Sequence, residues 1–486
     1  MKADLILTPE NKKRGFKWKK LILVLIPIFI LNGFITPVPK GTSYEGIDRK
    51  AQNIEFLYDL TYEKDGKSIK EQRIFKEQLK LIEEAEDFII ADMFLFNDDY
   101  NRKFKVEYPN LSEKLTNAFI EKKEKNPEIK IIFITDEINN FYGVYESPYI
   151  KKLKDNNIDV IITNLEKLRD SNPIYSGIWR SVIKWFGTSG KGWLPNSFRP
   201  DSSKVTLRGY LKLLNFKANH RKVIVSEKSA IVSSMNPHDA SGYHSNIGFK
   251  MKGDILFDLV SSELEIAKLS GYKGVDDFKI SHNSNIEENN LTTIALITES
   301  KIRDNLIREI KTTKKGNKIM IGMFYLSHRD IIKELISAAK GGVDVKIVLD
   351  PNKDAFGIEK NGIPNRQVAY EMKKKSNNSI EVKWYDTHGE QYHTKMVIIE
   401  KENQAIIIGG SANLTRRNID DYNLETNVMI KTLKDTELYK DIKDYFNRIW
   451  TNEDGHYTIE YENYKEDSLV KTLIYRFQEW SGLSTF

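Results

Sequence analysis

The chain has 486 residues, enough for two or three domains with sizeable buried cores. Its 75 lysine and arginine residues against 69 aspartate and glutamate residues give a net charge of +6, too small an excess to mark nucleic acid as a partner. Cysteine is absent, so disulfides, thiolate catalysis and cysteine-ligated zinc are excluded.

The first forty residues combine a basic stretch with the apolar run LILVLIPIFILNGFIT at 21–36. As a helix, this run would span about 24 Å, against a hydrocarbon core of roughly 30 Å. No small-x-small cleavage site follows it, so we expect residues 1–40 to be an uncleaved signal anchor rather than a secretory signal peptide. The positive-inside rule then predicts a single-pass protein of the cell membrane with its catalytic part outside, or a secreted protein if the segment is cleaved.

Beyond this segment, helical and strand patterns follow one another in the same order twice. Each half contains a helical pattern, a buried strand and two further strands, at 72–87, 88–98, 130–139 and 158–164 in the first half and at 301–318, 319–330, 345–354 and 380–386 in the second. Strands that alternate with helices predict an α/β fold, and the repeated order predicts two duplicated α/β/α sandwich domains.

Each half then reaches a short apolar strand that begins with a histidine and a lysine two residues apart. These are His220 and Lys222 in NHRKVIVSE, and His393 and Lys395 in YHTKMVIIE. Side chains two apart on a strand point to the same face, so each pair would project together. An imidazole can attack or protonate a phosphorus centre while an ammonium holds its oxygens. One such motif is usually accidental, but two copies in matching surroundings favour catalysis.

We divide the chain into residues 1–40, a first half at 41–275, a polar linker at 276–292 and a second half at 293–486. The first half is longer than the second, and most of its extra residues lie in an insertion at about 165–219.

Residues 172–186 of this insertion carry an apolar stripe at helical spacing, with Asn172 as N-cap and Pro173 at the first helical position. The stripe fits two alternatives, packing onto the protein core or lying at a membrane surface. The membrane alternative would place four aromatic residues against lipid: Trp179, Trp185, Phe186 and Trp193.

The two motif sets resemble those of the phospholipase D superfamily, including its cardiolipin synthase branch, over roughly residues 70–450. The residues responsible are His220-x-Lys222 with SSMN at 233–236, and His393-x-Lys395 with GGSAN at 409–413. The resemblance implies one active site between the halves, a phosphohistidine intermediate, and catalysis without a metal or cofactor. The catalytic residues that it implies are His220, Lys222, Asn236, His393, Lys395, Ser411, Asn413 and Glu425, with His220 as the nucleophile.

The sequence departs from the family pattern at two places. Glu227 and Glu400 stand seven residues after the histidines, where the family has aspartate, so we expect a shifted supporting network. Glu425 lies twelve residues after Asn413, whereas Gly248 stands twelve after Asn236, which leaves the orienting partner of one histidine unknown; Asp239 is a candidate.

Together these features predict a membrane-anchored phosphodiesterase or phosphatidyltransferase that acts on phospholipids, with the two halves forming a pseudo-dimer within one chain. No nucleic-acid partner is expected, because a nuclease should show a more strongly basic groove. A metal-independent nuclease of the same superfamily and a catalytically vestigial membrane-surface binding protein are the alternatives.

Overall fold

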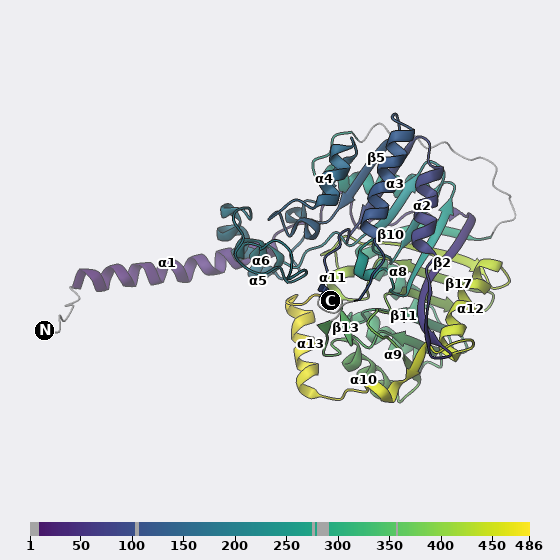
Figure 1. Cartoon of the computed structure of the whole chain (residues 1–486). Helices are drawn as coiled ribbons and strands as arrows, with labels where there is room; N and C mark the ends of the chain where they lie inside the picture. The colour runs from purple at the N-terminus through teal and green to yellow at the C-terminus, as the bar shows by residue number, and fades with distance from the viewer. Residues whose placement is uncertain (1–8, 103–105, 275–277, 279–290, 356–357) are drawn as a thin grey trace.

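Two mixed β-sheets with helices packed around them form the body of the molecule (Figure 1). The computed structural model describes residues 9–102, 106–274, 278, 291–355 and 358–486. The predicted linker at 276–292 therefore lies almost entirely outside the described residues.

The first sheet has eight strands in the order β3-β2-β9-β8-β7-β4-β5-β6. Its strands are β2 (Gln52–Lys64), β3 (Lys67–Glu71), β4 (Phe88–Met93), β5 (Lys130–Thr135), β6 (Asp159–Ile162), β7 (Lys222–Ser226), β8 (Ala230–Ser233) and β9 (Asn246–Lys252). Only β4, β5 and β6 run parallel to one another; the other pairs are antiparallel.

The second sheet has nine strands in the order β1-β10-β18-β17-β16-β11-β12-β15-β19. Its strands are β1 (Arg49–Lys50), β10 (Thr293–Thr298), β11 (Lys318–Met323), β12 (Asp344–Leu349), β15 (Ile380–Tyr385), β16 (Lys395–Glu400), β17 (Gln404–Gly410), β18 (Thr426–Leu433) and β19 (Thr458–Glu460). The run from β10 to β15 repeats the order and the relative directions of the run from β2 to β6 in the first sheet. A small hairpin, β13 (Asp354–Ala355) with β14 (Ile358–Glu359), stands apart.

Helices cover the sheets because the central strands are buried on both faces. Strands β4 and β16, for example, are buried at every residue. The longer covering helices are α2 (Ile74–Glu84), α3 (Leu111–Lys125), α4 (Pro148–Asp155), α7 (Ile255–Leu269), α8 (Ser300–Lys311), α9 (Arg329–Lys340), α10 (Asn365–Lys375), α12 (Glu437–Thr451) and α13 (Leu469–Ser481). One apolar core cluster contains residues of both sheets, including Ile90 and Val223 from the first and Ile398 and Val428 from the second. The two halves are thus joined through a common core, and the predicted α/β class is confirmed.

Residues just before the first sheet belong with the second half. Strand β1 pairs with β10, and the backbone amide of Ser43 donates to the carboxylate of Glu299 at 2.7 Å. Residues 43–50 therefore lie along the second sheet, although the sequence division assigns them to the first half.

Helix α1 (Pro9–Phe34) corrects the predicted membrane anchor. It includes the basic stretch as well as the apolar run, and its apolar part, Leu21 to Phe34, rises only about 21 Å. Among the helices that the structure describes, none combines the length and apolar character needed to cross a bilayer. The predicted single-pass anchor is therefore wrong, and with it falls the argument that placed the catalytic part outside the membrane.

The insertion packs against the end of α1 in close contact. A Cβ atom on Gly177 of α5 (Pro173–Ile178) would lie 2.1 Å from the carbonyl oxygen of Phe29, and one on Gly33 would lie 1.9 Å from that of Pro173. Only glycine at these positions lets the two backbones approach so closely. Pro173 begins the helix as predicted, but the side chain of Asn172 donates to the carbonyl of Leu214 instead of capping it.

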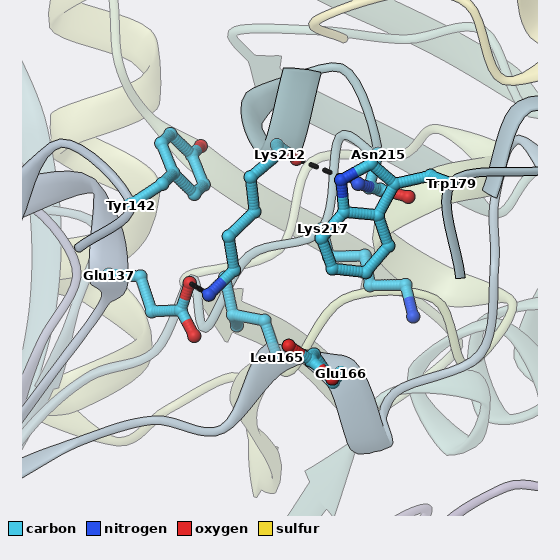
Figure 2. A pocket seen from close by; sticks show the side chains of 8 residues that line it. All are labelled: Glu137, Tyr142, Leu165, Glu166, Trp179, Lys212, Asn215 and Lys217. Carbon is cyan, nitrogen blue, oxygen red and sulfur yellow. Dashed lines mark hydrogen bonds and ion pairs between the residues drawn. The ribbon is translucent and has the colours of Figure 1, made fainter. Parts of the chain in front are cut away.

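The predicted single helix at 172–186 is divided into three segments. After α5 come a π-helical turn, η4 (Trp179–Ile183), and a 3-10 turn, η5 (Lys184–Phe186). The change of winding turns Trp179 inward, where it lines a cavity of about 20 Å³ with Lys212 and Lys217 (Figure 2). Trp179 is therefore a core residue and no candidate for lipid contact, whereas Trp185, Phe186 and Trp193 are exposed.

Candidate active site

The two histidine segments lie where the halves meet. The segment before β7 pairs with the segment before β18, through a bridge between Asn219 and Leu424. The segment before β16 pairs with the segment before β9, through a bridge between Tyr392 and Ser245. The backbone amide of His220 donates to the carbonyl of Leu424 at 2.9 Å, which ties the first histidine directly to the second half.

A cavity of about 240 Å³ opens between these segments. It is lined by both histidines and by both predicted asparagines, His220, His393, Asn236 and Asn413. Each histidine also packs against a phenylalanine that follows a parallel strand. The rings of Phe94 and His220 are 4.8 Å apart, and those of Phe324 and His393 are 5.0 Å apart. The structure thus brings the four residues predicted from the two halves into one cavity.

Lys222 and Lys395 lie beneath the histidines and are fully buried. Each ammonium donates to the carbonyl oxygen of its own histidine, at 2.7 Å for Lys222 and 2.8 Å for Lys395. Burial lowers the pKa of Lys222 to about 7, and burial together with the neighbouring Lys222 lowers the pKa of Lys395 well below its ordinary value. An anion in the cavity would restore the charge of both groups, because opposite charge favours the protonated form.

His220 is held by a carboxylate from the other half. Its Nδ1 lies 2.8 Å from Oε1 of Glu425, which also accepts hydrogen bonds from the side chains of Ser411 and Asn418. Burial lowers the pKa of His220 to about 4, although Glu425 acts in the opposite direction. Burial favours the protonated form of Glu425, yet His220 and Lys222 hold its pKa below the ordinary value. His220 is therefore a neutral imidazole beside a charged carboxylate, with Nε2 as the nitrogen that can attack.

His393 is held by an amide instead. Its Nδ1 lies 3.1 Å from Oδ1 of Asn246, the first residue of β9. The hydroxyl of Ser234 donates to Asn246, just as the hydroxyl of Ser411 donates to Glu425. In both halves the backbone amide of the next residue, Ile247 or Thr426, donates to the oxygen of that serine. Asn246 thus occupies the position of Glu425, ten residues after Asn236 instead of twelve.

The sequence comparison missed Asn246 because it assumed equal spacing in the two halves. Asp239, the suggested partner, instead bonds the backbone amide and hydroxyl of Ser112 at the start of α3. A search for any polar residue at the start of the last central strand would have found Asn246.

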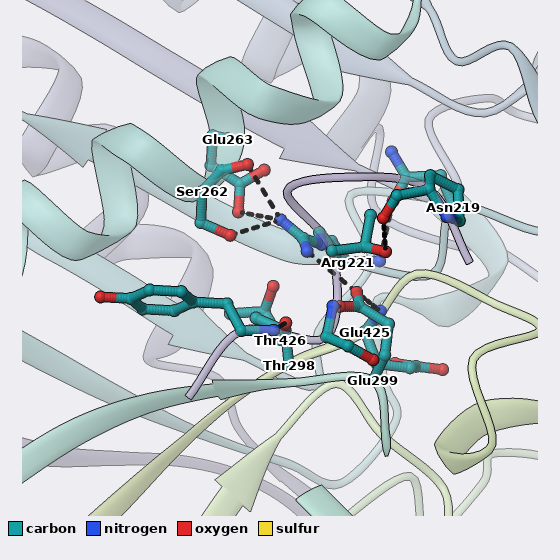
Figure 3. A network of polar contacts seen from close by, with 12 residues as sticks. Asn219, Arg221, Ser262, Glu263, Thr298, Glu299, Glu425 and Thr426 are labelled. Carbon is teal, nitrogen blue, oxygen red and sulfur yellow. Dashed lines mark hydrogen bonds and ion pairs between the residues drawn. The ribbon is translucent and has the colours of Figure 1, made fainter. Parts of the chain in front are cut away.

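A buried ion network behind the site was also missed. Arg221 is fully buried and donates to Glu263 of α7 and to Glu299 of the second half, at 3.2 and 2.9 Å (Figure 3). The same oxygen of Glu299 accepts from the backbone amide of Glu425 at 3.0 Å. The network therefore connects β7 to the segment that carries Glu425, and holds this carboxylate in place.

The two asparagines are prepared to bind a polar ligand. Asn236 and Asn413 are 3% and 5% exposed. Within the described part of the chain, neither side-chain oxygen has a hydrogen-bond partner. A buried acceptor without a partner is costly, and a ligand that brings a hydrogen-bond donor to these oxygens would supply the missing contact.

Glu227 and Glu400 lie at the ends of β7 and β16 that point away from the histidines. Glu227 accepts from the backbone amides of residues 86, 87 and 88, and Glu400 accepts from the side chains of Tyr439 and Lys443. Both carboxylates therefore stabilise strand ends, and the supporting contacts of the histidines come from Glu425, Asn246 and the Arg221 network.

Two similar mixed sheets thus meet at one cavity between the paired His-x-Lys segments. Residues 306–450 match the family model "Cardiolipin synthase, PLD-like domain", and so include the second histidine motif. Over this part of the chain, the match agrees with the resemblance to the phospholipase D superfamily that the motifs indicate.

One solved structure agrees with this fold over nearly the whole chain. Phosphatidylserine synthase of Haemophilus influenzae Rd KW20 is 10% identical, with a TM-score of 0.58 over 90% of this chain and 96% of that one. Polyphosphate kinase of Porphyromonas gingivalis is 12% identical over 88% of this chain and 53% of its own, with a TM-score of 0.44. No curated protein is similar enough in sequence to count as a match.

Proposed function

We propose that the chain exchanges the phosphodiester of a phospholipid, either hydrolysing it or passing the phosphatidyl group to an alcohol, through a phosphohistidine. The observation that carries the proposal is one cavity that is lined by two imidazoles with different partners, each of which is followed by a buried lysine two residues on. The description of the matching family model, which concerns a cardiolipin synthase, supports a phospholipid as substrate.

The unequal partners support different roles for the histidines. In the first step Nε2 of His220 bonds to phosphorus, the bond from phosphorus to the leaving alcohol oxygen breaks, and His393 gives that oxygen a proton. The charged carboxylate of Glu425 stabilises the positive imidazole ring that attack creates. In the second step water or another alcohol loses its proton to His393 and attacks phosphorus, which releases His220.

His393 must be protonated for the first step, and the charge of the bound substrate favours this protonated form. Burial and the adjacent Lys395 lower the pKa of His393 well below its ordinary value. A phosphodiester anion between Lys222 and Lys395 opposes that effect. Asn236 and Asn413 would donate hydrogen bonds to the phosphate oxygens in the same position.

The two halves, residues 41–275 and 293–486, are best explained as a duplication, which the repeated strand order supports. Each half then contributes one histidine, one lysine and one asparagine to a single site.

Product analysis tests the proposed reaction. The purified chain is incubated with mixed phospholipid vesicles, with and without glycerol or phosphatidylglycerol, and products are identified by mass spectrometry, with His220→Ala as control. Phosphatidate indicates hydrolysis, and cardiolipin indicates transfer. Unchanged lipids together with cleavage of added DNA would refute the proposal in favour of a nuclease.

A further inference from the structure

Helix α13 turns its apolar face toward solvent. Leu469, Leu473, Phe477 and Trp480 recur at helical spacing and are 79%, 70%, 54% and 69% exposed. The residues that α13 buries are Tyr475 and Glu479. A surface helix normally has the opposite arrangement, so this face is built to contact something other than water.

The buried side of α13 is anchored by polar contacts. The Tyr475 hydroxyl accepts from Arg329 at 2.7 Å, and Glu479 accepts from the hydroxyl of Ser327 at 2.7 Å. These contacts fix the rotation of the helix about its axis, and so hold the apolar side chains on the side that faces solvent.

A groove with apolar and charged walls lies between α13 and the insertion. It has a volume of about 620 Å³, and its lining includes Ile174 and Trp480 together with basic and acidic residues, among them Arg416, Arg476, Asp330, Asp420 and Glu479. At its end Gly482 touches the insertion, since a Cβ there would lie 2.0 Å from the carbonyl oxygen of Ser171. The exposed rings of Trp185 and Phe186 stand on the insertion.

The same surface reaches the opening of the catalytic cavity. The segment after α13 places Thr485 in the cavity lining, and the guanidinium of Arg417, which also lines the cavity, donates to the carbonyl of Ser484 at 2.8 Å. A lipid held against α13 would thus lie next to the opening through which its phosphate must enter.

We propose that this docking face, Leu469, Leu473, Phe477 and Trp480 of α13 with Trp185 and Phe186 of the insertion, rests on the surface of a phospholipid bilayer. The inference rests on the proposed function, because it supplies the route by which a substrate with two acyl chains reaches a buried cavity. Exposed tryptophan beside arginine suits the boundary between acyl chains and anionic headgroups. A second copy of the chain on this face would cover the opening of the cavity, which argues against it as the occupant.

Site-specific fluorescence tests the contact directly. Because the chain has no cysteine, Phe477→Cys can carry a single polarity-sensitive fluorophore in the full chain, with Glu124→Cys on exposed α3 as matched control. With vesicles of phosphatidylcholine and phosphatidylglycerol, emission from position 477 should shift to the blue while emission from position 124 stays unchanged. No shift at 477, or a shift without vesicles that grows with protein concentration, would overturn the inference.

Comparison of two substrates separates docking from chemistry. Phe477→Asp should lower the rate on vesicles at least about tenfold and leave the rate on a soluble chromogenic phosphodiester within about twofold. Leu473→Asp should do the same, and Asn463→Asp, which adds the same charge off the docking face, should change neither rate. Full vesicle activity in both α13 variants would overturn the docking face. An unmodified chain that is inactive on both substrates would instead refute the proposed function, and the fluorescence result would still decide the docking.

Discussion

Replacing Glu425 by glutamine tests how the cavity activates His220. The substitution keeps the size of the side chain but removes the charge that lies 2.8 Å from Nδ1 of His220. A hydrogen bond to a charged group contributes about 1.5–3 kcal/mol. Since about 1.4 kcal/mol corresponds to a tenfold change in rate, loss of this contribution in the transition state should slow formation of the covalent intermediate about 10- to 150-fold.

The assay is the pre-steady-state burst of alcohol released from a soluble chromogenic phosphodiester. Glu309→Gln on α8, which removes a carboxylate paired with Lys401, serves as control and should leave the burst rate unchanged. Thermal unfolding of each variant shows whether it is folded. A folded Glu425→Gln protein with the full burst rate would refute the argument that this carboxylate stabilises the charged ring.

Three further predictions concern the same cavity. His220→Ala, His393→Ala and the double variant should fall to similar residual rates, because residues that act together show non-additive losses; full activity in either single variant would contradict the mechanism. Asn246→Asp places a carboxylate about 3.1 Å from Nδ1 of His393 and should raise the pKa of His393 by about one to three units, seen as an alkaline shift of the limb of the pH profile that His393 sets. Dimethyl phosphate, a monoanion at neutral pH, should bind more weakly as pH rises through about 7, because Lys222 loses its proton there; calorimetry showing no proton uptake on binding at about pH 8 would contradict this.

The pH profile of the Asn246 variant depends on the titratable groups around His393. Burial lowers the pKa of His393 most, and Lys395, His244, Lys222 and His220 lower it further. Behind Asn246 lies the carboxyl of Asp59, whose pKa burial raises to about 6. Below that pH, Asp59 and an aspartate at 246 can share a proton. The negative charge beside His393 is then smaller, so the variant should differ least from the unmodified chain at acid pH. Asn246→Leu, which removes the hydrogen bond without adding charge, should reduce the rate and leave the His393 limb without an alkaline shift.

Local sequence was sufficient for the central strands and for the position of a histidine and a lysine at the start of two of them. Apolar runs such as Met396 to Ile399 can only be satisfied by burial in a sheet, and alternation places His393 and Lys395 on the same side. The same reasoning applied to His220 and Lys222, and the repetition of the pattern indicated two similar halves. These inferences succeed because each depends on residues close together in the chain.

Tertiary structure decided which residues from distant segments become partners. Glu425 contacts His220 across 205 positions, and Asn246 contacts His393 across 147, so both pairs depend on how the halves dock. The membrane anchor failed for a local reason instead, because the apolar part of α1 is too short to cross a bilayer. Trp179 and α13 show the same limit: an apolar stripe reveals its period, but only packing against neighbours determines whether it faces the core, as Trp179 does, or solvent, as Phe477 does.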